Sequence, residues 1–242
     1  MKKRTRFMYM VTLILLPCSL LGQMRQTIEL ANLYKRAKLK AVNRYIEIVS
    51  SDTGAYVKVA ESKKEGIVWL PLKDFKNGTI EIQMRGKDVF QRSFIGIAFH
   101  GANDTTYDAV YCRPFNFFSS DPIRRIHAVQ YISQPNFTWE KLRKEKNAVF
   151  EKEIIDPPNP NDWFTMKLVV DNRTVKVYIN NAIQASLIVE KLNDRTSGKI
   201  GLFTADSSGG DFKTIKINHI NLPKKIFPVY KKAIKSRVEV LN

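Results

Sequence analysis

Four side chains of the kinds that bind polar ligands occur close together in the sequence: Arg92, His100, Tyr111 and Arg113. A tyrosine ring can stack on the apolar C–H face of a sugar, and an arginine donates several directed hydrogen bonds to hydroxyl or carboxylate groups. Side chains of these types are unusual together in a plain hydrophobic core. Their combination predicts a binding site for a sugar or another polar ligand.

The two segments that carry these residues alternate in the manner of β-strands. Within residues 93–100 and 107–113, small, aromatic and basic side chains alternate with mainly aliphatic ones. This pattern is typical of strands whose two faces meet different surroundings. We expect the aliphatic face to pack in the core and the other face, with His100, to meet the ligand. An alternative stays open, in which Arg113 pairs with Asp108 or Asp121 and braces loops.

Residues 78–86 form another predicted strand with one polar and one apolar face. If the apolar face packs into the core, Gln83 and Arg85 line the same concave sheet as the first group of residues. A solvated polar face is the alternative. Trp139, at the start of a predicted helix over residues 137–146, is positioned to cap a groove as a platform for a sugar ring.

The candidate catalytic groups are Glu81, Asp108 and His100, because acid–base catalysis needs a titratable side chain beside the reacting bond. A lone histidine on a strand is more often structural than catalytic. A second histidine, His127, lies in a predicted strand over residues 127–133. There it shares a face with Tyr131 and opposes Gln130, so only one of these two sets can face a groove.

We expect no cofactor, because the histidines and cysteines lack zinc-ligand spacing and no phosphate-binding glycine loop occurs. The acidic loop from Asp206 to Asp211 could hold a structural calcium ion, although a plain hairpin loop explains it better. Cys112 falls on the aliphatic face of its strand, which favours a buried and inert thiol.

The amino terminus has the features of a signal peptide over residues 1–22. A basic start at residues 2–6 precedes an apolar run at residues 8–16, which is too short for a membrane span. We expect an exported protein, periplasmic or extracellular, with no transmembrane segment in the mature chain. Lipid attachment at Cys18 is a weaker alternative, because Leu-Leu-Pro precedes it where small residues are expected.

The chain is strongly basic, with a formal net charge of +17 over 242 residues. Residues 1–22 contain four basic and no acidic side chains, so their removal leaves +13. This excess indicates either a solvated basic surface or a polyanionic partner, such as an acidic polysaccharide or a membrane surface. A nucleic-acid partner is not expected, because no recognisable binding motif is present.

Short alternating segments with turn residues between them predict an all-β fold of about a dozen strands. We divide the chain into the signal peptide, an N-terminal extension (23–43), one β-sandwich (44–220) and a basic C-terminal tail (221–242). The sandwich has two antiparallel sheets and one or two short helices. The predicted strands cover 45–50, 55–61, 66–70, 78–86, 93–100, 107–113, 127–133, 148–155, 163–171, 174–180, 182–190, 199–204 and 211–217.

Three stretches of sequence carry a resemblance to a known fold: Gly78–Gly101, Trp163–Val189 and Ser197–Ile217. They resemble the concanavalin A-like lectin/glucanase jelly roll, and the last two are similar to laminin-G-like and 3-keto-disaccharide hydrolase domains. The similarity covers residues 44–218. It implies a jelly-roll sandwich, and a function that ranges from lectin to glycosidase to interaction module.

Glucanases of this fold carry two glutamates and an aspartate along one strand, whereas Glu81 is followed on its face by Gln83 and Arg85. The first hypothesis is therefore an exported protein that binds carbohydrate on a concave sheet. The alternatives are a glycoside hydrolase of the 3-keto-disaccharide type and a non-catalytic module of the cell envelope. The predicted ligand-binding residues are Gln83, Arg85, Arg92, His100, Tyr111, Arg113 and Trp139.

Overall fold

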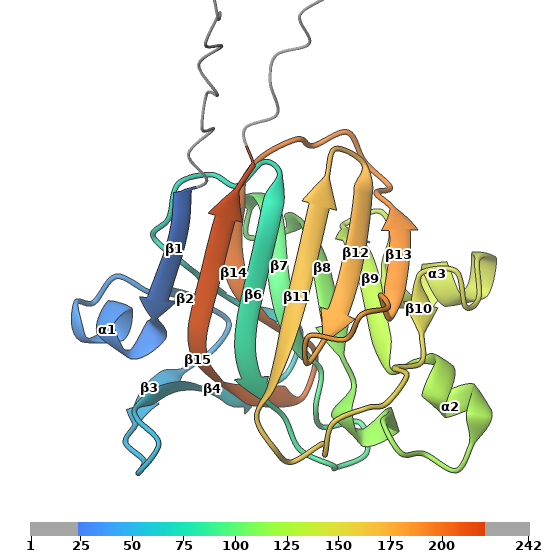
Figure 1. Cartoon of the computed structure of the whole chain (residues 1–242), viewed down its shortest axis with the longest axis horizontal. Helices are drawn as coiled ribbons and strands as arrows, with labels where there is room; N and C mark the ends of the chain where they lie inside the picture. Colours follow the sequence, from blue (N-terminus) through green and yellow to red (C-terminus); the bar gives the residue numbers. More distant parts are fainter. Residues whose placement is uncertain (1–23, 221–242) are drawn as a thin grey trace, which may run out of the picture.

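A computed structural model describes residues 24–220 of the chain. In this part of the protein, two antiparallel sheets pack face to face, with short helices at the periphery (Figure 1). The predicted all-β jelly-roll sandwich is confirmed. The predicted signal peptide, Cys18 and the basic tail lie outside the described residues. Within the described range, no helix has the length and apolar content that a membrane crossing requires.

The first sheet faces the viewer in Figure 1 and has the strand order β13-β12-β11-β6-β15-β4-β3, with β1 paired to β15. Every pairing in this sheet is antiparallel. Its strands are β1 (Met24–Glu29), β3 (Ile46–Val49), β4 (Tyr56–Ser62), β6 (Gly78–Arg85), β11 (Phe164–Asp171), β12 (Thr174–Ile179), β13 (Leu187–Glu190) and β15 (Ser208–His219).

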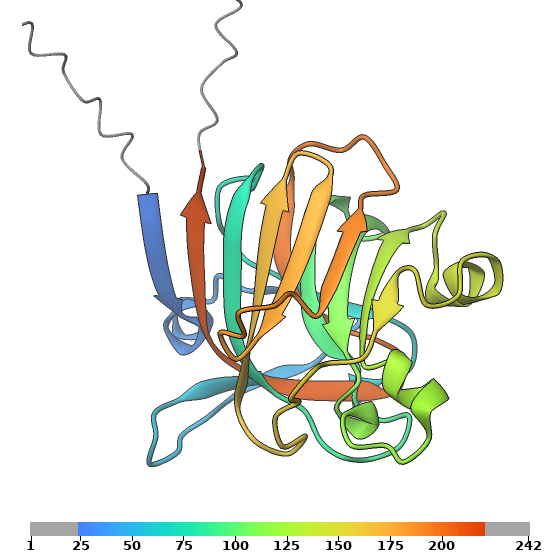
Figure 2. The same cartoon turned by 45° about the vertical axis from the view of Figure 1, so that its right-hand side comes forward.

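The second sheet lies behind the first and has the order β10-β9-β8-β7-β14-β5-β2 (Figures 1 and 2). Its strands are β2 (Lys40–Val42), β5 (Gly66–Trp69), β7 (Ile95–Asn103), β8 (Thr106–Cys112), β9 (Val129–Gln134), β10 (Glu151–Lys152) and β14 (Lys199–Thr204). The helices of the described part are α1 (Leu30–Lys35), α2 (Pro122–Ile126), α3 (Trp139–Glu145) and the 3-10 turn η1 (Pro114–Asn116).

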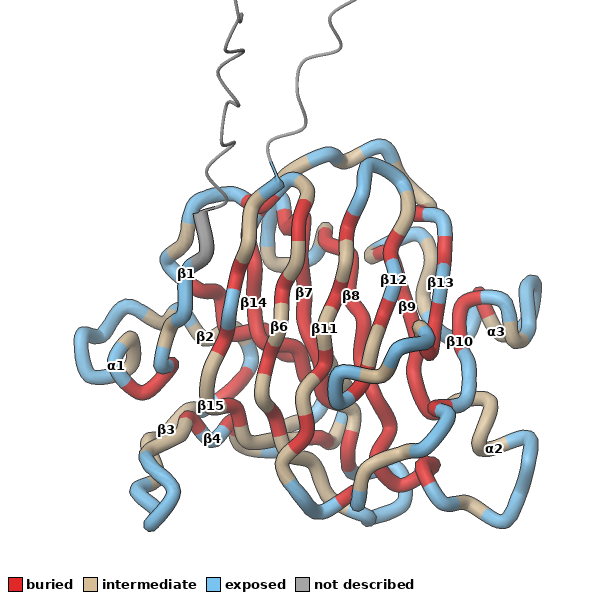
Figure 3. The backbone as a smooth tube through the Cα atoms, viewed as in Figure 1, coloured by how far each residue is buried: buried red, intermediate tan, exposed pale blue. Residues whose placement is uncertain are grey.

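The core lies between the sheets and follows the alternation of the sequence (Figure 3). In β6, Ile80 and Ile82 are fully buried, whereas the polar residues between them are partly exposed. In the second sheet, Ile97 and its neighbour Val110 point inward, as predicted. The thiol of Cys112 is also buried, and burial raises its pKa, which agrees with an inert side chain.

The outer face of the second sheet combines very small residues with aromatic rings. Gly96 lies opposite Tyr111, and a Cβ atom at Gly96 would stand only 2.0 Å from the carbonyl oxygen of Val110. The Tyr111 and Phe203 rings pack over this floor with centroids 5.3 Å apart, and Phe203 in turn meets Tyr107 at 6.1 Å. These rings cover the middle of the outer face of the second sheet, so a ligand can reach this face only at its end.

His100 does not lie on this outer face, and the prediction that it shares a face with Tyr111 is wrong. The pairing of β7 with β8 shifts register between Phe99 and Asn103, and His100 has a left-handed backbone with φ of 48°. Such an irregularity re-aims a side chain relative to simple alternation. The imidazole therefore turns into the interior, where its centroid lies 6.0 Å from that of Phe75.

The segment interpreted as an N-terminal extension belongs to the sandwich. β1 pairs with β15 in the first sheet, and β2 pairs with β5 in the second. Between them, α1 buries Leu30 completely against the core. The strands in this segment are short and their apolar residues are irregularly spaced. The sequence therefore shows neither the two-residue period of a strand nor the 3.6-residue period of a helix.

Candidate functional site

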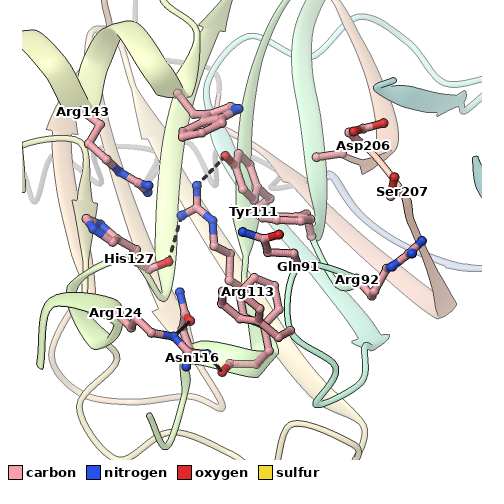
Figure 4. A pocket seen from close by; sticks show the side chains of 15 residues that line it. Gln91, Arg92, Tyr111, Arg113, Asn116, Arg124, His127, Arg143, Asp206 and Ser207 are labelled. Carbon is pink, nitrogen blue, oxygen red and sulfur yellow. Dashed lines mark hydrogen bonds between the residues drawn. The ribbon is translucent and has the colours of Figure 1, made fainter. Parts of the chain in front are cut away.

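A cavity of about 540 Å³ opens at the end of the outer face of the second sheet (Figure 4). It lies where β8 ends, and its wall also includes residues of η1, α2, α3, the loop before β7 and the loop after β14. The wall is rich in arginines and aromatic rings. The arginines are Arg92, Arg113, Arg124 and Arg143. The rings belong to Phe90, Phe94, Tyr111, Phe115 and Trp139.

Arg113 is held at the base of the cavity by a buried hydrogen-bond network. Its Nη2 atom donates to the Tyr111 hydroxyl at 3.0 Å and to the side-chain oxygen of Gln130, and its Nη1 atom donates to the carbonyl of His127 at 2.8 Å. The Tyr111 hydroxyl donates to Gln130 Oε1 at 3.1 Å. Burial raises the pKa of Tyr111 to about 12, so its hydroxyl stays neutral.

Glu151 supplies the negative charge behind the wall. Its carboxylate is 2% exposed and accepts two hydrogen bonds from Arg143, at 3.0 and 2.7 Å. The same carboxylate lies 3.7 Å from Arg113 Nη1 and 2.8 Å from His127 Nδ1. A buried carboxylate that contacts two guanidinium groups fixes their orientation, because each would be costly to bury alone.

His127 is placed between Glu151 and the cavity. It ends α2 as the C-cap residue, and its side chain is 12% exposed. Burial lowers the pKa of His127, and Arg143 and Arg113 act in the same direction, against the opposing effect of Glu151. The ring is therefore neutral near pH 7. With Nδ1 directed at Glu151, its Nε2 atom has no protein hydrogen-bond partner among the described residues.

Several donors in the wall have no protein partner in the described part of the chain. The guanidinium of Arg92 makes no hydrogen bond or ion pair there. Arg124 uses Nε for Asn116 and Nη2 for the carbonyl of Phe115, and no protein contact engages its Nη1 atom. The Nη1 atom of Arg143 is likewise left over. These N–H groups are the ones that a ligand can engage.

The charges of the site do not balance. Four arginines line the cavity, whereas Asp206 is the one carboxylate in its wall and Glu151 lies behind it. Figure 4 shows Arg143, His127 and Arg124 on one side, and Arg92 with Asp206 on the other. The excess positive charge favours an anionic group in the space between them.

Aromatic rings support the cations of the wall. The guanidinium carbons of Arg124 and Arg143 lie 4.5 Å and 5.0 Å from the ring centroids of Phe90 and Trp139. Phe90 is 58% exposed and Trp139 is 37% exposed, so both rings have surface available for further stacking.

The structure brings Arg92, Tyr111, Arg113 and Trp139 together around this one cavity. The three other predicted ligand-binding residues lie elsewhere. Arg113 pairs with Glu151 rather than with either aspartate considered from the sequence, and its role is to shape the cavity as well as to charge it.

Gln83 and Arg85 are on the outer face of the first sheet, so they do not share a surface with Tyr111. Alternation along β6 carries them to the solvent side of that sheet. Arg85 pairs with Asp211 at 2.7 Å and lies 4.8 Å from the Trp163 ring centroid. Glu81, on the same face, pairs with Lys216 at 2.8 Å. The expectation that both predicted strands line one concave sheet is therefore wrong.

His100 and Asp108 belong to a second polar cluster, which is closed and lies between the sheets. The Nε2–H of His100 donates to the carbonyl of Lys76 at 2.8 Å, and the Lys191 ammonium donates to His100 Nδ1 at 3.0 Å. Asp108 accepts a hydrogen bond from Tyr131 at 2.7 Å and pairs with Arg195 at 3.2 Å. Neither His100 nor Asp108 lines the cavity.

The most informative residues missed by sequence reasoning are Glu151, Arg143 and Arg124. Glu151 lies on the two-residue strand β10, Arg143 on α3 and Arg124 on α2. Turn and helix signals in the sequence do not show that these elements lie near β8. His127 was assigned to a strand, but β9 begins at Val129, so His127 and Gln130 both reach the same side of the sheet. The Pro122 helix start with an Asp121 cap was the available signal.

The acidic loop considered for calcium is divided between two places. Asp206 lines the cavity, whereas Asp211 pairs with Arg85 on the first sheet. Among the described residues, no group of three histidine, cysteine, aspartate or glutamate side chains is arranged to hold a metal ion.

The fold is that of concanavalin A-like lectins and glucanases. Residues 34–218 match the family described as the 3-keto-alpha-glucoside-1,2-lyase-like domain, and the chain belongs to this family. No curated protein is similar enough to count as a match.

Solved structures share the sandwich at low sequence identity. The exoplasmic/lumenal domain of VIP36 in its Ca²⁺-bound form aligns with a TM-score of 0.50 and 8% identity, over 78% of this chain and 86% of its own. The carbohydrate binding module CBM66 from Bacillus subtilis aligns with a TM-score of 0.48 and 14% identity, over 75% and 92%. A Bacillus subtilis protein of unknown function with a galectin-like fold gives 0.48 and 13%, over 75% and 87%.

Proposed function

We propose that this protein binds a carbohydrate in the cavity at the end of the second sheet, and that the arginines of the cavity hold an acidic group of that carbohydrate. The observation that carries the proposal is the wall itself, with four arginines and five aromatic rings around about 540 Å³. Rings suit the apolar face of a sugar, and guanidinium groups suit a carboxylate or sulfate.

The family supports a sugar ligand, because its description names a lyase acting on 3-keto-alpha-glucosides. Export through residues 1–22, which is part of the proposal, would bring the site to the compartment where acidic polysaccharides occur. The guanidinium of Arg92 and the N–H groups of Arg124 and Arg143 that have no protein partner within residues 24–220 are the expected contacts for the acidic group.

A binding experiment on residues 23–242 tests the proposal. After a glycan-array screen, calorimetry should give tighter binding of an acidic oligosaccharide than of a neutral one of equal length, with affinity that falls as salt rises. Arg92→Ala should weaken the acidic ligand selectively. Arg173→Ala, which removes an exposed cation paired with Glu190, is the matched control and should change nothing. Equal affinity for both ligands would refute the acidic version, and no binding of any glycan would refute the whole proposal.

Cleavage of a 3-keto-glucoside is the second candidate function. Family membership favours it, together with the presence of a neutral histidine in the cavity wall. The catalytic candidates from the sequence do not support it, since Glu81 faces solvent on the first sheet and His100 and Asp108 are closed in the interior. Incubation with a 3-keto-glucoside and detection of the released alcohol tests this activity directly. An unchanged substrate would exclude it.

A further inference from the structure

A protein that only binds a sugar does not need a histidine beside a buried carboxylate, as His127 lies beside Glu151. Glu151 Oε2 lies 2.8 Å from Nδ1 of the ring, and although this contact is not aligned as a hydrogen bond, the nearby carboxylate favours the tautomer that carries its proton on Nδ1. The other ring nitrogen, Nε2, then has a free lone pair and no protein partner in the described residues. A histidine oriented by a buried carboxylate in this way has the geometry of a general base.

The carboxylates around the cavity do not suit hydrolysis by a pair of acids. Such a mechanism needs two carboxyl groups on either side of the bond, about 5–10 Å apart. Glu151 is occupied by both hydrogen bonds from Arg143 and is only 2% exposed, so it cannot meet a sugar. Asp206 is the one carboxylate in the cavity wall. A single base beside several cations points instead to proton abstraction next to a carboxylate.

We propose that the cavity catalyses β-elimination of a uronic-acid-containing glycan, with His127 as the base. His127 Nε2 takes the C5 proton, which lies next to the uronate carboxylate held by Arg92, Arg124 and Arg143. The electron pair of that C–H bond forms the C4=C5 double bond, and the bond from C4 to the glycosidic oxygen breaks. The proton then passes from His127 to the leaving oxygen, so the reaction consumes no water and no oxidant.

The arginines make the step feasible, because neutralising the carboxylate lowers the pKa of the neighbouring C–H bond and stabilises the negative charge that develops there. Glu151 acts as a positioning residue whose carboxylate lies beside Nδ1, and Arg113, directly after β8, and Arg143, on α3, contact the same carboxylate. This inference rests on the proposed binding of an acidic sugar in the same cavity.

The test uses residues 23–242 with polygalacturonate, alginate and hyaluronate, and measures the ultraviolet absorbance of the conjugated 4,5-unsaturated product. We expect absorbance to grow with at least one of them, and His127→Asn to slow it by at least about a hundredfold while binding is retained. His219→Asn, on β15, is the control and should keep wild-type activity. The rate should also fall at acid pH as His127 becomes protonated.

If His127→Asn fails to fold, the acid limb of the wild-type pH–rate profile and a His127→Gln variant provide the same test. Acidic glycans that bind but stay intact would overturn the elimination and leave the binding proposal standing. Absence of binding would overturn both. Product formation at an equal rate in His127→Asn would remove His127 from the reaction. Elimination from a 3-keto-glucoside alone would show that the acidic substrate class is wrong.

Discussion

Two charged clusters occupy opposite faces of the second sheet, and each is built around one histidine and one buried carboxylate. On the inner face, the fully buried side chains of His100 and Asp108 lie in a closed cluster. On the outer face, His127 and Glu151 lie beside a cavity, and the histidine retains 12% exposure. Strand β8 supplies residues to both, since Asp108 points inward and Tyr111 outward.

The clusters differ in how their histidine is engaged and in whether unused hydrogen-bonding atoms can be reached from the cavity. In the closed cluster both nitrogens of His100 are engaged, by Lys76 and by Lys191. In the open cluster one nitrogen of His127 and several guanidinium N–H groups have no protein partner within residues 24–220. Similar residue types therefore serve stability when they are closed off between the sheets, where even the unpartnered Asp108 Oδ2 is out of a ligand's reach, and ligand binding when they face a cavity. The following predictions test this distinction.

The largest effect should come from removing the carboxylate of the open cluster. Glu151→Ala leaves the side chains of Arg113 and Arg143 without their counter-charge, and breaking a buried pair in this way costs about 3–5 kcal/mol. Urea unfolding measures the loss. Glu190→Ala is the matched control, because Glu190 is 71% exposed and its partner Arg173 is 52% exposed, so little change in the unfolding midpoint is expected. Equal midpoints for both variants would show that the cluster is not held by Glu151.

The closed cluster should give the fold an acid-sensitive stability. Burial, and next the charge of Lys191, lower the pKa of His100 to about 4. The unfolded chain therefore binds a proton that the folded chain does not, and the contribution present above pH 6.5 is lost as the pH falls toward 4, by about 3 kcal/mol. Unfolding of the wild type and His100→Asn across this range measures it. Asparagine tolerates the left-handed backbone at this position.

Their difference in unfolding free energy should shrink as the pH falls, because only the wild type carries the titrating ring. Stability curves that run parallel from pH 7 to pH 4 would contradict the assignment, whatever the constant offset between the two proteins.

Arg92→Ala should separate binding from stability. The guanidinium makes no hydrogen bond or ion pair among the described residues, so its removal should leave the unfolding midpoint unchanged. Loss of one charge-assisted contact should weaken an acidic oligosaccharide about tenfold. Calorimetry on the variant and on Arg173→Ala gives the comparison. A destabilised Arg92→Ala protein would mean that this arginine is structural, like those of the closed cluster.

Much of the fold could be predicted from alternation, because period-two patterns report which side of a strand is buried. Strand β6, for example, has the predicted faces. The bulge at His100 could not be predicted, since it depends on pairing with β8 and not on local composition. That single irregularity moves a histidine from the expected ligand face to the interior.

Apart from Trp139 on α3, the residues of the site that were predicted lie on long strands or close to them. Tyr111 and Arg113 follow directly from the pattern of β8, but their partner Glu151 lies on a two-residue strand with no periodicity to detect. Gln83 and Arg85 had the right chemistry and the right alternation, and they lie on the other sheet. Alternation assigns a residue to one of two faces, but it does not say which sheet contains the strand.

The smallest effect should come from the ring at the cavity rim. Trp139 packs against Arg143, 5.0 Å from its guanidinium carbon, and is 37% exposed. Trp139→Ala should weaken acidic and neutral sugars alike by about 1 kcal/mol, because stacking does not depend on the sugar's charge. Trp139→Phe should keep much of the affinity, and Ile183→Ala, at a residue that is 99% exposed outside the cavity wall, should keep all of it. A loss confined to acidic sugars would mean that Trp139 acts through Arg143, and that the open cluster recognises charge alone.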